Sequence, residues 1–467
     1  MSLTKIRDLQ VDWFGDHKSP SELARNLDQA FDGIGFTESY VNEAIARART
    51  GAQRTKVIKD NVWGMIEIDE PTIRLLDSPI IQRLRRIRQL GFSYLTYPSA
   101  EHSRFVHSLG MLGVVTRFID SANRTPKQPA GHPFQPHEVP LSDRYDLVHA
   151  ALLHDAGHLP FSHASEFAFE ALAGTRVGTL PLSDFFDAPE SRGLVRRPKL
   201  AEIISAAIVL SRRFGRYYTE YVRAEEQLPD AINDGPLRIA SYVLGRPTDN
   251  LRIGYAELIS GRVIDADKLD YVNRDGLACG IPIGIDVGRL FLRSGFLKVE
   301  KDELNRLRGR SGLEFVDTDQ VHFIVNSAGQ DTIEELIAAK TSLYHRVYFH
   351  QTTRNAERLY EKVIESAIDL GPEGDDLDVL KVWASNDEQF LAKLSASSNS
   401  TVRQLALRLT GRQLPKRAAV FGQGELASLF PFKKVFPKGG FSYDEAPLKL
   451  WTAPLKLETV LHSLRTE

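Results

Sequence analysis

The segment ALLHDAGHLPFSH, residues 151–163, places side chains with acid–base and metal-binding chemistry in an apolar setting. His154 and Asp155 follow three residues that favour burial, and His158 and His163 come soon after. Burying an ionisable side chain costs free energy unless the group is paired or bound to a metal. Eight of the 13 histidines also lie between residues 102 and 163. The cluster therefore predicts a functional site, although any one of these histidines could simply be a hydrogen-bonded core residue.

Imidazole and carboxylate groups together suit divalent first-row ions such as Mn, Fe, Ni, Co or Zn. On a helix, His154 and Asp155 would point about 100° apart. His158, four residues beyond His154, would share the face of that histidine. One segment cannot complete a coordination shell, so other helices must supply further ligands. The candidates are His107 in SRFVHSLG and one of the acids in VIDADKLDYVNRD, residues 263–275.

A second pattern repeats every four residues in the same acidic segment. Asp267, Tyr271 and Asp275 share one helical face, and Lys268 lies at its edge. Such a stripe is either a solvated surface or the lining of a pocket. The apolar residues that flank it indicate a packed helix, which favours the pocket. Arg104, three residues before His107, can project on the same side as that histidine.

The elements that must position these residues are mostly helices, so the predicted fold is mainly α. Ser142 and Ser162 can each cap a helix, and Pro160 prevents the first of these helices from continuing smoothly. Alternating apolar and polar residues predict a hairpin within 57–72. The pattern predicts loops at 123–142 and 174–198. Helices are predicted at 22–34, 40–52, 71–91, 103–120, 143–158, 257–280 and 334–368, the last as one helix or two.

The composition is that of an ordinary globular chain. The 467 residues are 42% hydrophobic and 26% charged, with a net charge of −2, so no global excess of positive charge indicates nucleic-acid binding. The single cysteine, Cys279, excludes an intramolecular disulfide and a cysteine-based zinc cluster. We find neither a long apolar run nor a signal-peptide core. These features predict a cytoplasmic protein with no membrane partner.

Four blocks in order resemble a known family. RFVHSLG, HDAGHLPFSH and DADKLDYVNRD are similar to motifs of the HD-domain phosphohydrolases, above all the deoxynucleoside triphosphate (dNTP) triphosphohydrolases. DSPIIQRLRRIRQLG with YPSAEHSRFVHS resembles the family's entry helix, and LYHRVYFHQTTR, residues 343–354, resembles its later substrate-side helix. The resemblance covers roughly residues 60–355.

The resemblance assigns a role to each matching residue. The ligands that it implies for a divalent ion (Mn, Fe, Ni, Co, Zn or Mg) are His107, His154, Asp155 and Asp267. The groups that it places beside the scissile phosphate are His158 and His163, supported by Glu166. The phosphate contacts that it implies are Arg104, Lys268 and Lys340. The lining that it implies for a sugar and base pocket is Gln89, Tyr271 and Asp275.

The resemblance also implies an architecture and partners. The expected fold is an HD-domain helical core at 61–300, with a helical extension and a small hairpin at its N-terminal side and an α-rich C-terminal lobe. The extension covers 1–60, and the lobe, which completes the pocket and makes oligomer contacts, covers 301–467. The expected partners are a dNTP substrate, an activating nucleotide and further copies of the chain in a dimer, tetramer or hexamer.

The implied activity is hydrolysis of a dNTP to a deoxynucleoside and inorganic triphosphate. One position departs from the family, which has a further histidine followed by glutamate. Here Ala201 precedes Glu202, and no histidine occurs from 164 to 321. Two alternatives therefore stay open. One is a phosphodiesterase or 3′-exonuclease on single-stranded nucleic acid that uses the basic segment 82–90. The other is a weakly active nucleotide-sensing subunit.

Overall fold

The computed structural model describes eleven stretches of the chain. They are residues 20–48, 54–129, 132–170, 176–177, 180–181, 199–224, 235–247, 249–261, 264–311, 317–368 and 378–416. These stretches are mainly helical, so the predicted fold class is confirmed. The chain divides into two units, 1–414 and 415–467, and only Pro415 and Lys416 of the second unit are described. All the candidate site residues belong to the first unit.

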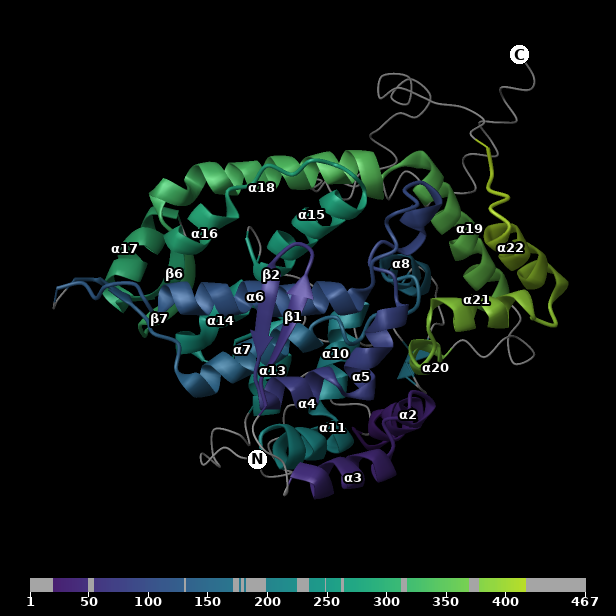
Figure 1. Cartoon of the computed structure of the whole chain (residues 1–467), viewed down its shortest axis with the longest axis horizontal. Coiled ribbons are helices and arrows are strands. Elements are labelled where there is room, and N and C mark those ends of the chain that lie inside the picture. Colours follow the sequence, from purple (N-terminus) through teal and green to yellow (C-terminus); the bar gives the residue numbers. More distant parts are fainter. Residues whose placement is uncertain are drawn as a thin grey trace, which may run out of the picture. The chain divides into compact units, whose positions relative to one another are not determined.

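Two buried helices form the centre of the first unit. α6 spans Arg104–Ala122 and α7 spans Leu141–Leu153, and the two pack along each other (Figure 1). Both are apolar on most faces, which is typical of helices inside a core. Four helices continue this core: α10 (Leu200–Leu210), α13 (Gly235–Val243), α14 (Ile253–Ser260) and α15 (Ala266–Ala278). α15 packs against α6 and thereby joins the two motifs that the sequence separates.

The strands are short and antiparallel. β1 (Lys56–Asp60) and β2 (Gly64–Ile68) form the predicted hairpin, which lies against α6 (Figure 1). β6 (Ser294–Val299) pairs with both β3 (Phe134–Pro136) and β7 (Gln320–Val325). β4 (Arg176–Val177) pairs with β5 (Leu180–Pro181) within the predicted loop 174–198, most of which lies outside the described residues.

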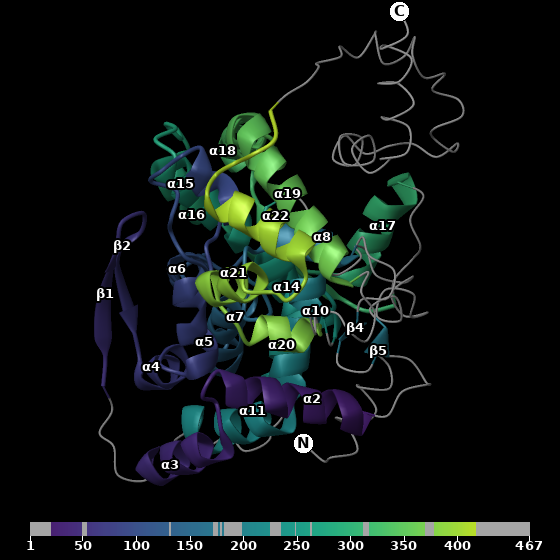
Figure 2. The same cartoon turned by 90° about the vertical axis from the view of Figure 1, so that its right-hand side faces the viewer.

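Further helices surround this core. α19, α21 and α22 pack against one another, with α20 close to α2 (Figure 2). No helix in the described stretches combines the length and the apolar character needed to cross a membrane. The bounds of these helices are α2 Pro20–Gly33, α3 Glu38–Ala48, α4 Glu70–Leu76, α5 Pro79–Arg83, α8 His163–Glu170, α11 Arg212–Tyr217, α16 Val287–Arg293, α17 Lys301–Ser311, α18 Gln330–Leu343, α19 Gln351–Ile368, α20 Val379–Trp383, α21 Asp387–Ser395 and α22 Ser400–Thr410.

Several predicted elements are confirmed. α6 matches the helix predicted at 103–120, and α2 and α3 match the two helices near the N-terminus. The pattern at 334–368 contains two helices, α18 and α19. A π-helical turn, Tyr344–Tyr348, separates them. Single π-turns are frequent at functional sites.

Three predicted helices are wrong in extent. The 71–91 helix breaks at Ser78, whose side chain accepts a hydrogen bond from the N–H of Ile81 and starts α5. The 257–280 helix breaks before Asp265, which caps α15. The 143–158 helix begins before Ser142, so this serine is not its cap, and ends at Leu153. His158 therefore does not lie on a helical face shared with His154.

The turn after α7 packs closely against α10. A Cβ at Gly157 would lie 2.1 Å from the carbonyl oxygen of Ala201 on α10. The chain can pass α10 this closely only with glycine at this point, and it does so in a turn rather than in a helix. Ser162 is also not a helix cap of the predicted kind, because its hydroxyl donates to the carbonyl of Arg88 (2.6 Å).

Candidate metal centre

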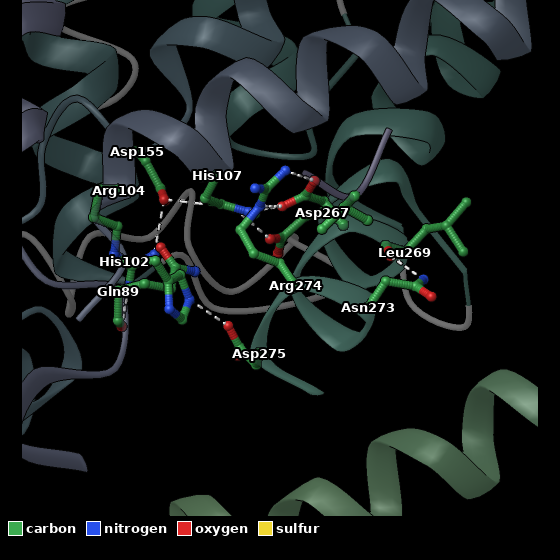
Figure 3. Close-up of polar contacts among 12 residues, drawn as sticks. Gln89, His102, Arg104, His107, Asp155, Asp267, Leu269, Asn273, Arg274 and Asp275 are labelled. Atoms are coloured by element: carbon green, nitrogen blue, oxygen red, sulfur yellow. Dashed lines mark hydrogen bonds and ion pairs between the residues drawn. The ribbon is translucent and has the colours of Figure 1, made fainter. Parts of the chain in front are cut away.

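Four side chains from separate parts of the sequence converge at the centre of the first unit. His107 Nε2 lies 3.1 Å from Asp267 Oδ1 and 3.6 Å from Asp155 Oδ2 (Figure 3). It also lies 3.2 Å from His154 Nε2. His154 Nε2 lies 3.3 Å from Asp155 Oδ1. Ligand atoms at about 2.1 Å from one ion lie roughly 3 Å from each other. His107, His154 and Asp267 therefore have the spacing of a coordination shell, with ligand atoms within 4.8 Å of one another, and Asp155 adjoins the two histidines.

Helix ends position these donors. His107 lies in the first turn of α6, and Asp267 lies in the first turn of α15. The side chain of Asp265 caps α15 by accepting a hydrogen bond from the backbone N–H three residues later (2.7 Å). His154 is the C-terminal cap of α7, and Asp155 follows in the turn. Because all these residues lie at the ends of packed helices, the backbone that carries them is held firmly.

The outer nitrogen of each histidine is already engaged. His107 Nδ1 lies 2.7 Å from Asp270 Oδ2, and His154 Nδ1 lies 2.8 Å from the carbonyl oxygen of Ala151. In both rings Nδ1 is the donor, so Nε2 faces the other candidate ligands, and an ion that binds there would displace any proton on it. This arrangement is typical of metal-binding histidines, whose second nitrogen donates to a carboxylate or a carbonyl.

Asp270 is held by its own set of partners. Arg274 Nε and Nη2 donate to its two oxygens at 2.8 and 2.9 Å, and the indole N–H of Trp63 also donates to it. A Cβ at Gly110 of α6 would lie 2.0 Å from Asp270 Oδ1, so only glycine permits this approach of α15 to α6. The sequence reasoning missed Asp270, although an acid with arginine four residues later was a usable signal.

The electrostatic environment stabilises positive charge at the centre. Burial disfavours the charged form of His107, but hydrogen bonds to Asp267 and Asp270 outweigh burial and raise its pKa to about 10. Burial opposes the charge of Asp155, yet Arg104 and the neighbouring histidines hold its pKa well below the usual value. The carboxylates are therefore charged at neutral pH, as the ligands of a divalent cation must be.

Replacing Asp270 with asparagine is expected to weaken metal binding about 10- to 100-fold, because the His107 ring would lose its charged partner. A competition titration against a chelator measures this change. Asp120→Asn is the matched control, since Asp120 lies at the far end of α6 and pairs with Arg144 (2.6 Å). Unchanged affinity in folded Asp270→Asn protein would show that Asp270 does not support the centre.

A second group of side chains adjoins these donors. Glu166 lies between two histidines, with Oε2 at 2.5 Å from His163 Nδ1 and Oε1 at 3.4 Å from His158 Nδ1. His158 Nε2 lies 3.1 Å from Asp155 Oδ1, which links the group to the candidate ligands. The side chain of His163 is 44% exposed and that of His158 is 4% exposed. His163 is therefore the imidazole that a bound molecule can reach.

The members of this second group differ in their charge near pH 7. Burial and the charge of Arg104 lower the pKa of His158 to about 4, so its ring is neutral near pH 7. Burial opposes the charge of Glu166, but His158 and His163 outweigh it and hold the pKa of Glu166 well below its usual value. The three donors are also close enough to hold a cation. A charged carboxylate on a reachable imidazole orients the ring for proton transfer.

Arg104 lies beside the candidate ligands. It is buried, and its guanidinium donates to Asp155 Oδ2 (2.7 Å), to Ser162 Oγ (3.0 Å) and to the carbonyl of Gln89 (3.4 Å) (Figure 3). These contacts orient Asp155. Arg104 therefore supports Asp155, and its predicted contact with phosphate stays a prediction.

The two lysines expected at phosphates make other contacts. Lys268 Nζ donates to Asp265 Oδ2 (2.5 Å) and to the carbonyl of Gly261 (2.7 Å). Lys340 lies over the ring of Tyr344, 5.5 Å from its centroid. Neither contact is with a candidate ligand, and the roles of both lysines at phosphates stay predictions.

The residues expected in a sugar and base pocket lie around Asp275. Its Oδ1 lies 2.8 Å from His102 Nε2, and its Oδ2 accepts a hydrogen bond from Tyr348 (2.6 Å). The ring of Tyr348 lies 6.5 Å from that of Tyr271. Gln89 donates its backbone N–H to the carbonyl of His102 (2.9 Å). Within the described residues, Gln89 Oε1 and His102 Nδ1 are buried without a hydrogen-bond partner, as expected where a ligand binds. Sequence reasoning missed His102 and Tyr348.

Comparison with known proteins agrees with this arrangement. The family described as HD associated region matches residues 311–434. A protein of Dictyostelium discoideum named deoxynucleoside triphosphate triphosphohydrolase SAMHD1 homolog is 24% identical over 421 residues, which span 86% of this chain and 69% of that protein. These similarities support an HD-domain, dNTPase-like family for this chain.

Other relatives match shorter parts of this chain. The Bacillus subtilis protein named Uncharacterized protein YwfO is 31% identical over 321 residues, 68% of this chain and 57% of that protein. The Gallus gallus protein named deoxynucleoside triphosphate triphosphohydrolase SAMHD1 is 32% identical over 250 residues, 52% of this chain and 37% of that protein. The chain thus covers less than two thirds of each of these two relatives.

Position 201 contributes to the site through its backbone N–H. Ala201 lies in the first turn of α10 at 2% exposure, and its N–H donates to Glu166 Oε1 (3.2 Å). Glu202 accepts a hydrogen bond from the backbone N–H of Lys199 (3.0 Å) at the start of the same helix. The methyl side chain of Ala201 has no ionisable group, so it cannot act as a general acid. The contact with Glu166 comes from the main chain.

Proposed function

We propose that this protein is a metal-dependent phosphohydrolase that cleaves dNTPs to a deoxynucleoside and inorganic triphosphate. The observation that carries the proposal is that His107, His154 and Asp267 offer ligand atoms within 4.8 Å of one another, with Asp155 beside both histidines. The Dictyostelium and Gallus relatives carry the name of this activity. Two imidazoles and two carboxylates suit Mn, Fe, Ni, Co or Zn better than Mg, which prefers oxygen ligands.

In this proposal the four side chains hold a divalent ion, which supplies polarisation of a phosphoryl oxygen and a bound water of lowered pKa. Arg104 keeps Asp155 oriented through their 2.7 Å contact. Hydrolysis at the α-phosphorus leaves the 5′ oxygen of the deoxynucleoside in need of a proton. His163 is the proposed donor because it is reachable and its Nδ1 is held by Glu166 (2.5 Å). General acid groups of this kind contribute about 10²- to 10⁴-fold.

The sugar is proposed to bind beside Asp275, where the unpartnered polar atoms of Gln89 and His102 face a ligand. Tyr271 would cover this pocket, and Lys268 and Lys340 would move to the phosphates on binding. An activating nucleotide, assembly as a dimer, tetramer or hexamer, and a cytoplasmic location complete the proposal.

The nuclease alternative depends on the basic segment 82–90. Two of its arginines make internal contacts: Arg83 donates to two carbonyls at 2.6 Å, and Arg88 pairs with Asp387 (3.5 Å) and Glu388 (3.3 Å). Arginines that are engaged within the protein are less available for a phosphate backbone, which favours the dNTP proposal. The substitution at Ala201 is the observation that favours a sensing subunit with weak turnover.

A product assay tests the proposal. The protein is incubated with each of the four dNTPs, singly and mixed, with Mn²⁺ or Mg²⁺, and products are separated by ion-exchange chromatography. Equal release of deoxynucleoside and triphosphate is the expected result. Shortening of a labelled single-stranded oligonucleotide without triphosphate release would favour the nuclease. Nucleotide binding without either product would favour the sensing subunit.

A further inference from the structure

The turn that carries His158 into α8 contains two residues with left-handed backbone. Phe161 has φ 61° and Ser162 has φ 54°, and neither is glycine. Left-handed conformations are disfavoured for a residue with a Cβ. Such conformations persist only where the surroundings hold them, and they are frequent at functional sites. The contacts that hold this turn therefore decide where His158 and His163 lie.

The part of the chain next to the candidate ligands supplies some of these contacts. Ser162 Oγ donates to the carbonyl of Arg88 (2.6 Å) and accepts a hydrogen bond from Arg104 (3.0 Å). The ring of Phe161 stacks on Phe92 with centroids 4.4 Å apart. These contacts fix the side chains of the turn. The N–H of Ser162 bonds within the turn to the carbonyl of Leu159 (3.0 Å), while the N–H of Phe161 and the carbonyl of Ala156 bond to partners outside it.

A distant segment supplies those partners. Asp387, the first residue of α21, is fully buried and lies 226 residues beyond Phe161. Its Oδ1 accepts a hydrogen bond from the N–H of Phe161 (2.8 Å), and its Oδ2 accepts one from the N–H of Arg88 (3.0 Å). One carboxylate thus joins the left-handed turn to the extended segment beside it.

The helix before it, α20, holds the start of the same turn. The indole N–H of Trp383 donates to the carbonyl of Ala156 (2.8 Å). Arg83 donates to the carbonyls of Trp383 and His158, both at 2.6 Å, and its guanidinium lies over the Trp383 ring. Trp383 and Asp387 both belong to residues 311–434, the part matched by the HD associated region.

We propose that Asp387 and Trp383 are positioning residues, which hold the strained turn 156–162 so that His158 and His163 face the candidate ligands. The proposal rests on the proposed function for the role of these histidines in turnover. In this proposal α20 and α21 influence the reaction through the hydrogen bonds that Trp383 and Asp387 make with the backbone of the turn.

Asp387→Asn tests the proposal. A buried amide offers one oxygen, so it can accept from only one of the two N–H groups and turns a donor toward the other. We expect kcat to fall about 10- to 100-fold, because small misplacement of reacting groups is costly. KM and bound metal should stay unchanged. Hydrogen exchange of the amides of residues 156–163 should quicken, while exchange in α6 and α15 should not.

Two further variants keep the test decisive. Trp383→Phe removes the indole N–H together with the five-membered ring and should lower kcat several-fold, with the same local exchange signature, if Asp387→Asn fails to fold. Asp378→Asn is the matched control, since Asp378 accepts from the N–H groups of Leu380 (2.9 Å) and Lys381 (3.2 Å). Asparagine caps helices as well as aspartate does. The control should keep kcat and exchange at the level of the unchanged protein.

Failure of this inference is distinguishable from failure of the proposed function. Wild-type kcat and wild-type exchange in folded Asp387→Asn protein would overturn the positioning role. Uniformly faster exchange over the whole unit would also overturn it, because the carboxylate would then serve general stability. If the unchanged protein released no triphosphate, the proposed function would fail, and the exchange measurement would still decide whether Asp387 holds the turn.

Discussion

Asp155→Asn is expected to yield a folded protein that retains no metal and turns over at least about 10³-fold more slowly. A bound divalent ion contributes several kcal/mol of transition-state stabilisation, and each 1.36 kcal/mol is about a tenfold change in rate. Asp155 also pairs with buried Arg104 at 2.7 Å. Asparagine keeps an oxygen for that guanidinium, whereas alanine would strand a buried charge at a cost of about 3–5 kcal/mol.

The measurement for Asp155→Asn is metal content by elemental mass spectrometry together with triphosphate release. Asp143→Asn is the matched control, because Asp143 is a buried acid of α7 that pairs with Arg252 (3.2 Å) rather than with the candidate ligands. Circular dichroism checks that both variants fold. Retention of a full complement of metal by Asp155→Asn would contradict the ligand assignment.

His163→Ala is expected to have the second largest effect, a fall in kcat of about 10²- to 10⁴-fold with bound metal unchanged. The reason is that His163 is the reachable imidazole of the second group, while its neighbour His158 is enclosed. Because the side chain is 44% exposed, its removal should leave the fold intact. The change would therefore act on proton transfer alone.

His132→Ala is the control for His163→Ala, since His132 is exposed and its ring contacts only the main chain of Phe134 among the bonds described. Steady-state kinetics and metal analysis are made on both variants. Loss of metal along with activity in His163→Ala would instead place His163 in a metal site with Glu166, whose carboxylate lies 2.5 Å away. Unchanged kcat would remove His163 from the reaction.

Residue chemistry and helix boundaries differ in what they predicted about this chain. His107, His154, Asp155 and Asp267 were chosen for their ligand chemistry and for a family resemblance, and the structure places them together. Their role as ligands stays a prediction. The helix predicted at 143–158 was wrong in extent, because α7 ends at Leu153 and the turn that follows packs against α10 at Gly157, a contact that no local pattern contains.

The mainly helical fold class, the hairpin and the kinds of donor available follow from the amino-acid sequence, because periodicity and side-chain chemistry are local properties. The identity of the acid that supports His107, and the contact of Asp387 with Phe161 across 226 residues, depend on the folded chain. Asp270 and Asp387 look like ordinary helix acids in the sequence. Their partners depend on how closely distant helices pack, and such contacts arise only when the whole core is assembled.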